Sequence, residues 1–145
     1  MKITNKNARM DRAGKHNDRN FNLDNAPHID QNRVSENLYY TYNGDTEHRF
    51  SEIEREFYEL HFSDYLRSQN QRNEEIRHKE RNRTMEEYAR GSHTRPEDKI
   101  LQIGNINEHA SKDDLWDCAM EYMRRFDDLF GDQCKILDMA LHMDE

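Results

Sequence analysis

The sequence is short of the residues from which a large hydrophobic core is built. Hydrophobic residues make up 33% of the 145 positions, charged residues make up 36%, and the mean hydropathy is −1.33. An ordinary globular domain is roughly 45–50% apolar and about 25% charged. The length suits a single domain, but this composition argues against a compact, self-sufficient core. We therefore expect part of the chain to extend into solvent or to need a partner.

Other scarcities exclude other classes of protein. The chain has only 2 prolines and 5 glycines, while aromatic residues reach 10%, which is the opposite of a disordered chain. It has no run of 18 apolar residues and no apolar segment near Met1 like that of a secretory signal. We therefore predict a cytoplasmic protein without membrane contact. Cys118 and Cys134 form no CxxC pair, which excludes a zinc site of that kind, and we expect buried or idle thiols.

Charge is distributed unevenly along the sequence. Residues 1–95 hold 17 Lys and Arg against 17 Asp and Glu, whereas residues 96–145 hold 5 against 13. The net charge of −8 therefore arises in the last third, and residues 1–35 are mildly basic. The run 72–83 mixes five basic side chains with three glutamates. Two interpretations of this run are open: a solvated helix face with i,i+4 ion pairs, or a surface that contacts phosphate.

Local patterns predict an α+β fold with a largely antiparallel sheet. Two S/T-x-x-E capping boxes, Ser51 with Glu54 and Thr84 with Glu87, mark helix starts, and Gly91 and Gly131 suit helix ends. The predicted elements are a weak strand within 1–8, an irregular segment 9–48 with a short strand at 39–42, a helix from 51 to about 81, a short helix 84–90, a strand 99–103, a helix 111–131 and a strand 134–143.

Apolar spacing predicts which faces of these elements are buried. The second half of the long helix is almost wholly polar, so we expect it to project or to lie on something charged. The helix at 111–131 has the widest apolar face and is the best candidate for a core helix. The predicted buried positions are Ile53, Phe57, Leu60 and Tyr65 on the long helix, and Leu137, Met139, Leu141 and Met143 on one face of the last strand.

Two short clusters hold side chains that could carry chemistry. The first contains His16, Asn17 and Arg19; a neutral imidazole can act as a nucleophile or general base, and a guanidinium can hold a phosphate bidentately. The second, at 142–145, places one histidine and two carboxylates at a strand end, which suits the start of a metal site. Taken alone, each cluster also fits ordinary surface side chains, and two ligands do not fill a coordination sphere.

The order of these clusters resembles the plasmid mobilization and recombination relaxases, the Mob/Pre family. G-K-H-N-D-R-N-F (14–21) is similar to a first motif H-N-E-R-x-F, with Asp18 where the family more often has Glu. His28-Ile-Asp, with Arg33 and Asn37 after it, follows at the spacing of a second motif. A-L-H-M-D-E (140–145) is similar to a third motif that begins H-x-D-E. The resemblance spans the chain but is specific only in these motifs.

The resemblance implies a DNA strand-nicking enzyme with an antiparallel sheet flanked by helices. Such relaxases bind an origin of transfer, cut one strand by transesterification, stay attached to the 5′ phosphate and later rejoin it. A histidine triad holds Mn²⁺ or Mg²⁺. The partner is DNA, as single strand and duplex, and a homodimer of the full-length protein is an option. The implied roles are nucleophile for His16, activating acid for Glu145, DNA or phosphate contact for Asn17, Arg19 and Arg33, and metal ligand for His142.

One departure limits what this chain is expected to do alone. The family's third motif continues with a proline and two more histidines, which these 145 residues do not contain. We therefore expect residues 1–145 to be the N-terminal part of a single relaxase catalytic domain, truncated inside the metal motif, which binds metal poorly and does not nick DNA unaided. We expect the other histidines to be surface residues: His28, His48, His61, His78, His93 and His109.

Two alternatives stay open. A tyrosine nucleophile is the lesser option for the enzyme, with Tyr39, Tyr40 or Tyr42 in that role. The alternative from another class is a non-catalytic helical adaptor or DNA-associated interaction protein, which would use its polar helix 62–83 as a docking surface. A variant that loses His16 separates the two classes, because only the enzyme depends on that side chain.

Overall fold

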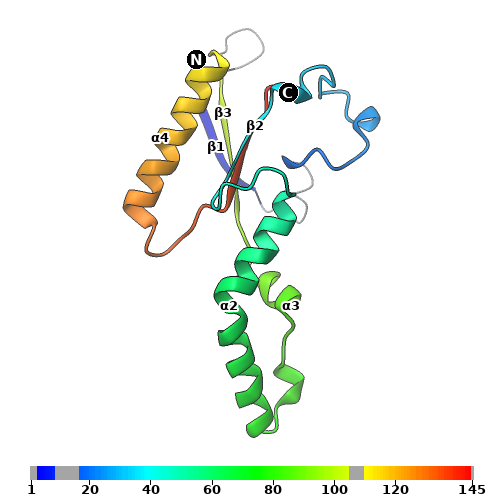
Figure 1. Ribbon diagram of the computed structural model, residues 1–145, viewed down its shortest axis with the longest axis vertical. Helices are drawn as coiled ribbons and strands as arrows, with labels where there is room; N and C mark the ends of the chain where they lie inside the picture. The colour runs from blue at the N-terminus through cyan, green and yellow to red at the C-terminus, as the bar shows by residue number, and fades with distance from the viewer. Residues whose placement is uncertain (1–2, 9–16, 105–109, 145) are drawn as a thin grey trace.

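The computed structural model describes residues 3–8, 17–104 and 110–144 (Figure 1). Two antiparallel strand pairs and one helix form the body, and a long helix leaves it with a short helix beside it. This confirms the α+β class. The strands are β1 (Ile3–Ala8), β2 (Leu38–Thr41), β3 (Asp98–Ile103) and β4 (Asp138–Leu141), and the helices are α2 (Phe50–Glu75), α3 (Met85–Ala89) and α4 (Lys112–Phe130).

The strands pair differently from the predicted single sheet. Among the described residues, β1 pairs only with β3 and β2 pairs only with β4, which gives two separate two-stranded ladders. The predicted strand 134–143 is shortened to β4 because its partner is short: Thr41 lies opposite Asp138 and Leu38 opposite Leu141. After Thr41 the chain turns at Gly44, whose φ of 78° is in the left-handed region that glycine favours. The length of β2 therefore limits the length of β4.

The start of α2 is set by a distant side chain. The predicted capping box of Ser51 and Glu54 is wrong, because the helix begins one residue earlier, at Phe50. The Arg49 N–H donates to the Glu52 carboxylate (3.1 Å), and the Phe50 N–H donates to the carboxylate of Asp18 (2.9 Å). A carboxylate that accepts from a free N–H at a helix start stabilises it. Asp18 therefore fixes the start of α2 to the segment of the first motif.

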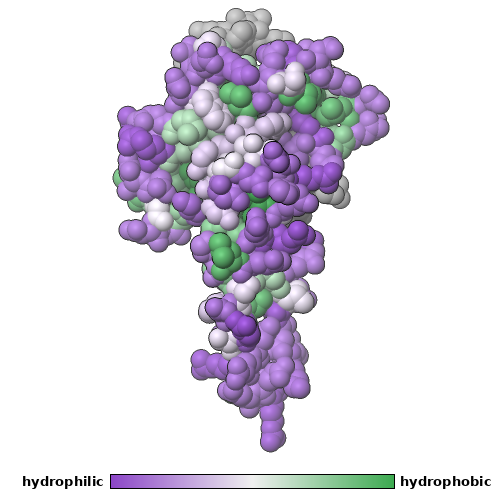
Figure 2. All heavy atoms as spheres, viewed as in Figure 1, coloured by the Kyte–Doolittle hydropathy of each residue, from purple (hydrophilic) through white to green (hydrophobic). Residues whose placement is uncertain are grey.

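The second half of α2 projects from the body, as its polar composition predicts (Figure 1). The helix was expected to reach residue 81 but ends at Glu75, and Arg77 has a left-handed φ of 60°. The chain then returns along α2 through a 3₁₀ turn, η3 (Lys79–Arg81), and α3 (Figure 1). We call residues 62–90 the arm. On the face that Figure 2 shows, its far end is hydrophilic.

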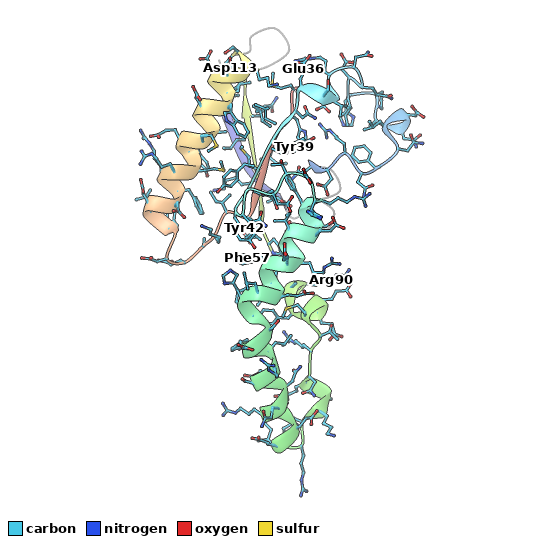
Figure 3. The ribbon with its side chains drawn as sticks, viewed as in Figure 1. Glu36, Tyr39, Tyr42, Phe57, Arg90 and Asp113 are labelled. Atoms are coloured by element: carbon cyan, nitrogen blue, oxygen red, sulfur yellow. The ribbon has the colours of Figure 1, made fainter. Side chains whose placement is uncertain are left out.

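Aromatic rings pack α2 against the end of β2 and against α3. The rings of Tyr42 and Phe57 meet edge to face where β2 ends beside α2, with centroids 5.2 Å apart (Figure 3). Further along α2, the ring of Tyr88 on α3 lies 5.5 Å from that of Phe62. The predicted stripe is wrong at two positions: Leu60 is 72% exposed and Tyr65 is 56% exposed. The face that is buried carries these residues instead: Phe50, Ile53, Tyr58 and Leu66.

Helix α4 has the predicted ends but buries less than expected. The Ser111 hydroxyl accepts a hydrogen bond from the Asp114 N–H (3.1 Å), and Gly131 follows the last turn. Met123 is the only buried residue of the helix, and Leu129 is 73% exposed. Both cysteines are exposed and free, so of the two expected alternatives, buried or idle thiols, burial does not apply. Within the described segments, none of the helices is long and apolar enough to cross a membrane.

Candidate functional site

A buried ion pair joins the two ends of the described chain. The guanidinium of Arg19 binds the carboxylate of Asp144 through two parallel contacts, Nε to Oδ2 at 2.9 Å and Nη2 to Oδ1 at 2.5 Å. The side chains are 4% and 0% exposed. Arg19 has a left-handed φ of 52°, an uncommon conformation for a residue with a Cβ atom. The fold therefore holds this backbone in a costly conformation at a bidentate ion pair.

Asn37 locks the same carboxylate from a third segment. Its side-chain amide donates to Asp144 Oδ2 (3.0 Å), and its carbonyl accepts from the Met143 N–H (2.7 Å). The Asp30 N–H donates to the backbone carbonyl of Asp144 (2.7 Å). Burial alone would raise the pKa of Asp144, but the hydrogen bonds from Arg19 and Asn37 outweigh it and hold the pKa below its usual value. The carboxylate is therefore charged at neutral pH.

The candidate metal ligand His142 lies at the edge of this network. Its side chain is 14% exposed, and Nδ1 is 3.8 Å from Oδ1 of Asp144. Asp144 does not suit a cation, because its oxygens already accept from a guanidinium and an amide. Within residues 3–8, 17–104 and 110–144, no three His, Cys, Asp or Glu side chains are grouped to hold a metal ion. The described residues thus offer one imidazole, which by itself does not make a metal site.

The other predicted site residues differ in their surroundings. His16 and Glu145 lie outside the described residues. The guanidinium of Arg19 is already bound to Asp144, and phosphate contact by Arg19 stays a prediction. Arg33 is partly exposed and binds Glu36 at the surface (3.2 Å), so phosphate contact there stays a prediction. Asn17 is half-buried two residues before Arg19.

The sequence did not reveal a second group of carboxylates. Glu54 comes from α2 and Asp138 from the start of β4, and both are half-buried. Burial first, and then repulsion from Asp138 and two further carboxylates, raises the pKa of Glu54 to about 8. Burial likewise raises the pKa of Asp138 to about 7, with repulsion from Asp98 and Asp18. We call these four residues the carboxylate cluster: Asp18, Glu54, Asp98 and Asp138.

A sequence signal for this cluster was present. Glu54 stands four residues after Phe50 and four before Tyr58, which are both buried, so it lies on the buried face of α2. Asp138 interrupts an apolar strand. In both cases a charged residue occupies a position that the apolar spacing assigns to the core, and this signal predicts both residues. Asp18 joins the cluster to the candidate site, because it is the neighbour of Arg19 and caps α2.

Comparisons with protein families, curated proteins and solved structures find no match to this chain. What the site can do follows from the geometry of its own residues. That geometry brings three sequence segments together at one buried carboxylate: 17–19, 30–37 and 142–144.

Proposed function

We propose that this chain belongs to a DNA strand-nicking relaxase that acts in plasmid mobilization or recombination. His16 is the nucleophile in this proposal, and Glu145 is the acid that accepts its proton. Asn17 and Arg33 contact the DNA backbone. The metal is Mn²⁺ or Mg²⁺, and it needs ligands beyond His142. When bound, such an ion would polarise the scissile phosphate.

The observation that carries the proposal is the ion pair between Arg19 and Asp144. These residues are 125 positions apart in the sequence, yet they come from the first and third motifs of the resemblance. His16 precedes Arg19 by three residues, which span at most about 11 Å of chain. Glu145 is the next residue after Asp144. The pair therefore supports a single site that draws on both clusters.

The proposed reaction needs a nucleophile and a proton acceptor at one phosphate. The imidazole nitrogen of His16 attacks the phosphorus, a nitrogen–phosphorus bond forms, and the bond to the 3′ oxygen of the DNA strand breaks. Glu145 takes the imidazole proton. The buried pair does not react. It positions the two segments. The guanidinium of Arg19 is bound to the carboxylate of Asp144, and the Asn37 amide binds the same carboxylate, so these groups have little freedom to move.

A strand-nicking assay tests the proposal. With Mn²⁺ present, the full-length protein is expected to convert supercoiled plasmid to the open circle and to form a covalent DNA adduct. His16→Ala is expected to abolish both products while DNA binding survives, because only the nucleophile is lost. His28→Ala is the matched control, since His28 is exposed and has no proposed role.

The outcomes of this assay separate the enzyme from a non-catalytic adaptor. Wild-type protein that gives neither nicked plasmid nor adduct overturns the relaxase proposal. Nicking that persists in His16→Ala overturns the assignment of His16 as the nucleophile. If the adduct is then lost when Tyr39, Tyr40 or Tyr42 is replaced by phenylalanine, that tyrosine is the nucleophile.

A further inference from the structure

The far end of the arm is a basic surface in an acidic protein. Residues 67–83 hold six Lys or Arg and three Glu, a net charge of +3, whereas the whole chain carries −8. Ile76 is the single exposed large apolar side chain in this segment. A lone exposed apolar residue is ordinary for a protein surface. The end of the arm is therefore suited to a charged partner rather than an apolar one.

Hydrogen bonds within the arm occupy its carboxylates. Glu74 accepts from the side-chain amide of Asn82 (3.2 Å), and Glu75 accepts from that of Gln71 (3.1 Å). The imidazole Nδ1 of His78 lies 2.7 Å from Glu80, and this contact lowers the pKa of the Glu80 carboxyl. The negative charges of the segment are thus already engaged locally.

Four cations of the same segment are left without such partners. Arg67 binds Asp64 one turn earlier, and Arg81 lies 3.9 Å from Glu80. The remaining basic side chains are exposed and make no ion pair in the structure, whose description covers this whole segment. They are Arg72, Arg77, Lys79 and Arg83.

The backbone that carries these cations is held in one shape. The side chain of Asn70 accepts from the Arg83 N–H (3.0 Å) and donates to its carbonyl (2.8 Å), which ties the returning chain to α2. The His78 N–H donates to the carbonyl of Asn73 (2.7 Å) at the turn. The cations on this turn are therefore presented by a preformed hairpin, which lowers the entropic cost of binding.

We propose that the end of the arm binds the sugar–phosphate backbone of duplex DNA beside the nicking site. The four cations contact phosphates and read no sequence. The choice of DNA rests on the proposed relaxase function; the basic surface itself is independent of it. Because the rest of the chain is acidic, this surface supplies most of the electrostatic attraction, and its loss has a large effect on binding.

Salt-dependent binding to a labelled duplex of arbitrary sequence tests this proposal. Each phosphate contact contributes about 0.9 to the slope of log K against log salt, so four contacts contribute about 3 to 4. The quadruple variant Arg72→Gln, Arg77→Gln, Lys79→Gln and Arg83→Gln is expected to lose about that much slope. Its dissociation constant at low salt is expected to rise at least about tenfold.

Two matched variants separate charge from folding. Neutralising four cations of the body, Lys112, Arg124, Arg125 and Lys135, to Gln removes the same charge and is expected to leave the slope nearly unchanged. Replacing Arg72, Arg77 and Arg83 with Lys keeps the charge and is expected to retain the slope. Unchanged binding by the quadruple variant overturns the arm proposal. So does equal loss in the body variant, or tighter binding to polyglutamate, RNA or anionic vesicles than to duplex DNA.

The plasmid assay keeps this proposal distinct from the proposed function. If wild-type protein nicks plasmid and the quadruple variant still binds duplex DNA normally, the proposed function is supported and the arm proposal is overturned. If wild-type protein does not nick plasmid but the quadruple variant loses the salt dependence of DNA binding, the arm is supported as a DNA-binding surface. The relaxase proposal is then overturned.

Discussion

Replacing Asp144 with alanine is expected to destabilise the protein by about 3–5 kcal/mol, the usual effect of removing one partner from a buried ion pair. The variant leaves the guanidinium of Arg19, 4% exposed in the structure, without its carboxylate. It also removes the acceptor of the Asn37 amide. Urea unfolding followed by circular dichroism measures the loss. Hydrogen exchange of the Asp30 and Met143 amides should rise with it, because both bond to this network.

Two further variants sharpen this prediction. Arg33→Ala removes an exposed arginine–glutamate pair from the same segment and should cost less than about 1 kcal/mol. The double variant Arg19→Met with Asp144→Leu should recover much of the stability lost by Asp144→Ala, because two apolar side chains can replace a buried pair. A loss below about 1 kcal/mol in Asp144→Ala would show that the pair does not hold the two segments together.

Raising the pH from 5 to 8 is expected to weaken the fold through the carboxylate cluster. Burial raises the pKa of Glu54 to about 8 and that of Asp138 to about 7 in the folded protein. In the unfolded chain both groups ionise near pH 4. Between these values the folded state binds more protons than the unfolded state, so the free energy of unfolding falls as the pH rises. Unfolding curves collected across this range measure a loss on the order of 3 kcal/mol.

Glu54→Gln tests the origin of this pH dependence. Glutamine resembles the protonated carboxyl but does not ionise, so the variant should match wild type near pH 5. At pH 8 it should be more stable by on the order of 2 kcal/mol. Glu59→Gln, an exposed position on the same helix, is the control and should follow wild type throughout. Wild-type stability that stays flat from pH 5 to 8 would rule out a buried, protonated cluster.

Asp144 makes the stability of the protein fall in the other direction, as the pH is lowered. Its pKa is lowered in the folded protein, so its contribution to stability is present above the pKa of about 4 that an unfolded aspartate has. That contribution is lost as the pH falls through the folded value. Together with the cluster, this places the most stable range in mildly acidic solution.

The features that depend on neighbouring residues in the chain followed from the sequence. Thr84 and Glu87 cap α3 as predicted, with the Thr84 N–H donating to the Glu87 carboxylate (2.8 Å). Ser111 caps α4 and Gly131 follows it. The strands at β1, β2 and β3 lie where short β-rich segments predicted them. Each of these signals acts over a few residues, so local propensity is enough to decide them.

The features that depend on distant residues could not be predicted from the sequence. The sequence suggested that Ser51 begins α2, but a carboxylate 32 residues earlier, Asp18, caps it at Phe50 instead. The carboxylate partner of Arg19 is 125 residues away, so no local pattern indicates the ion pair. Leu60 fitted the apolar stripe, yet it is 72% exposed, because the buried positions of α2 include Phe50, Tyr58 and Leu66 instead.

By itself, the sequence determined the α+β class, the caps of α3 and α4, the polar projecting half of α2 and the two clusters that frame the proposed site. The tertiary structure decided that these clusters meet at Asp144, that half-burial and mutual repulsion raise the pKa values of Glu54 and Asp138, and that four arm cations make no ion pair. The physical reason is that periodicity and capping are short-range, whereas burial and ion pairing depend on which distant segments come together. Composition was therefore informative about how little core there is, and only the fold shows which charges that core encloses.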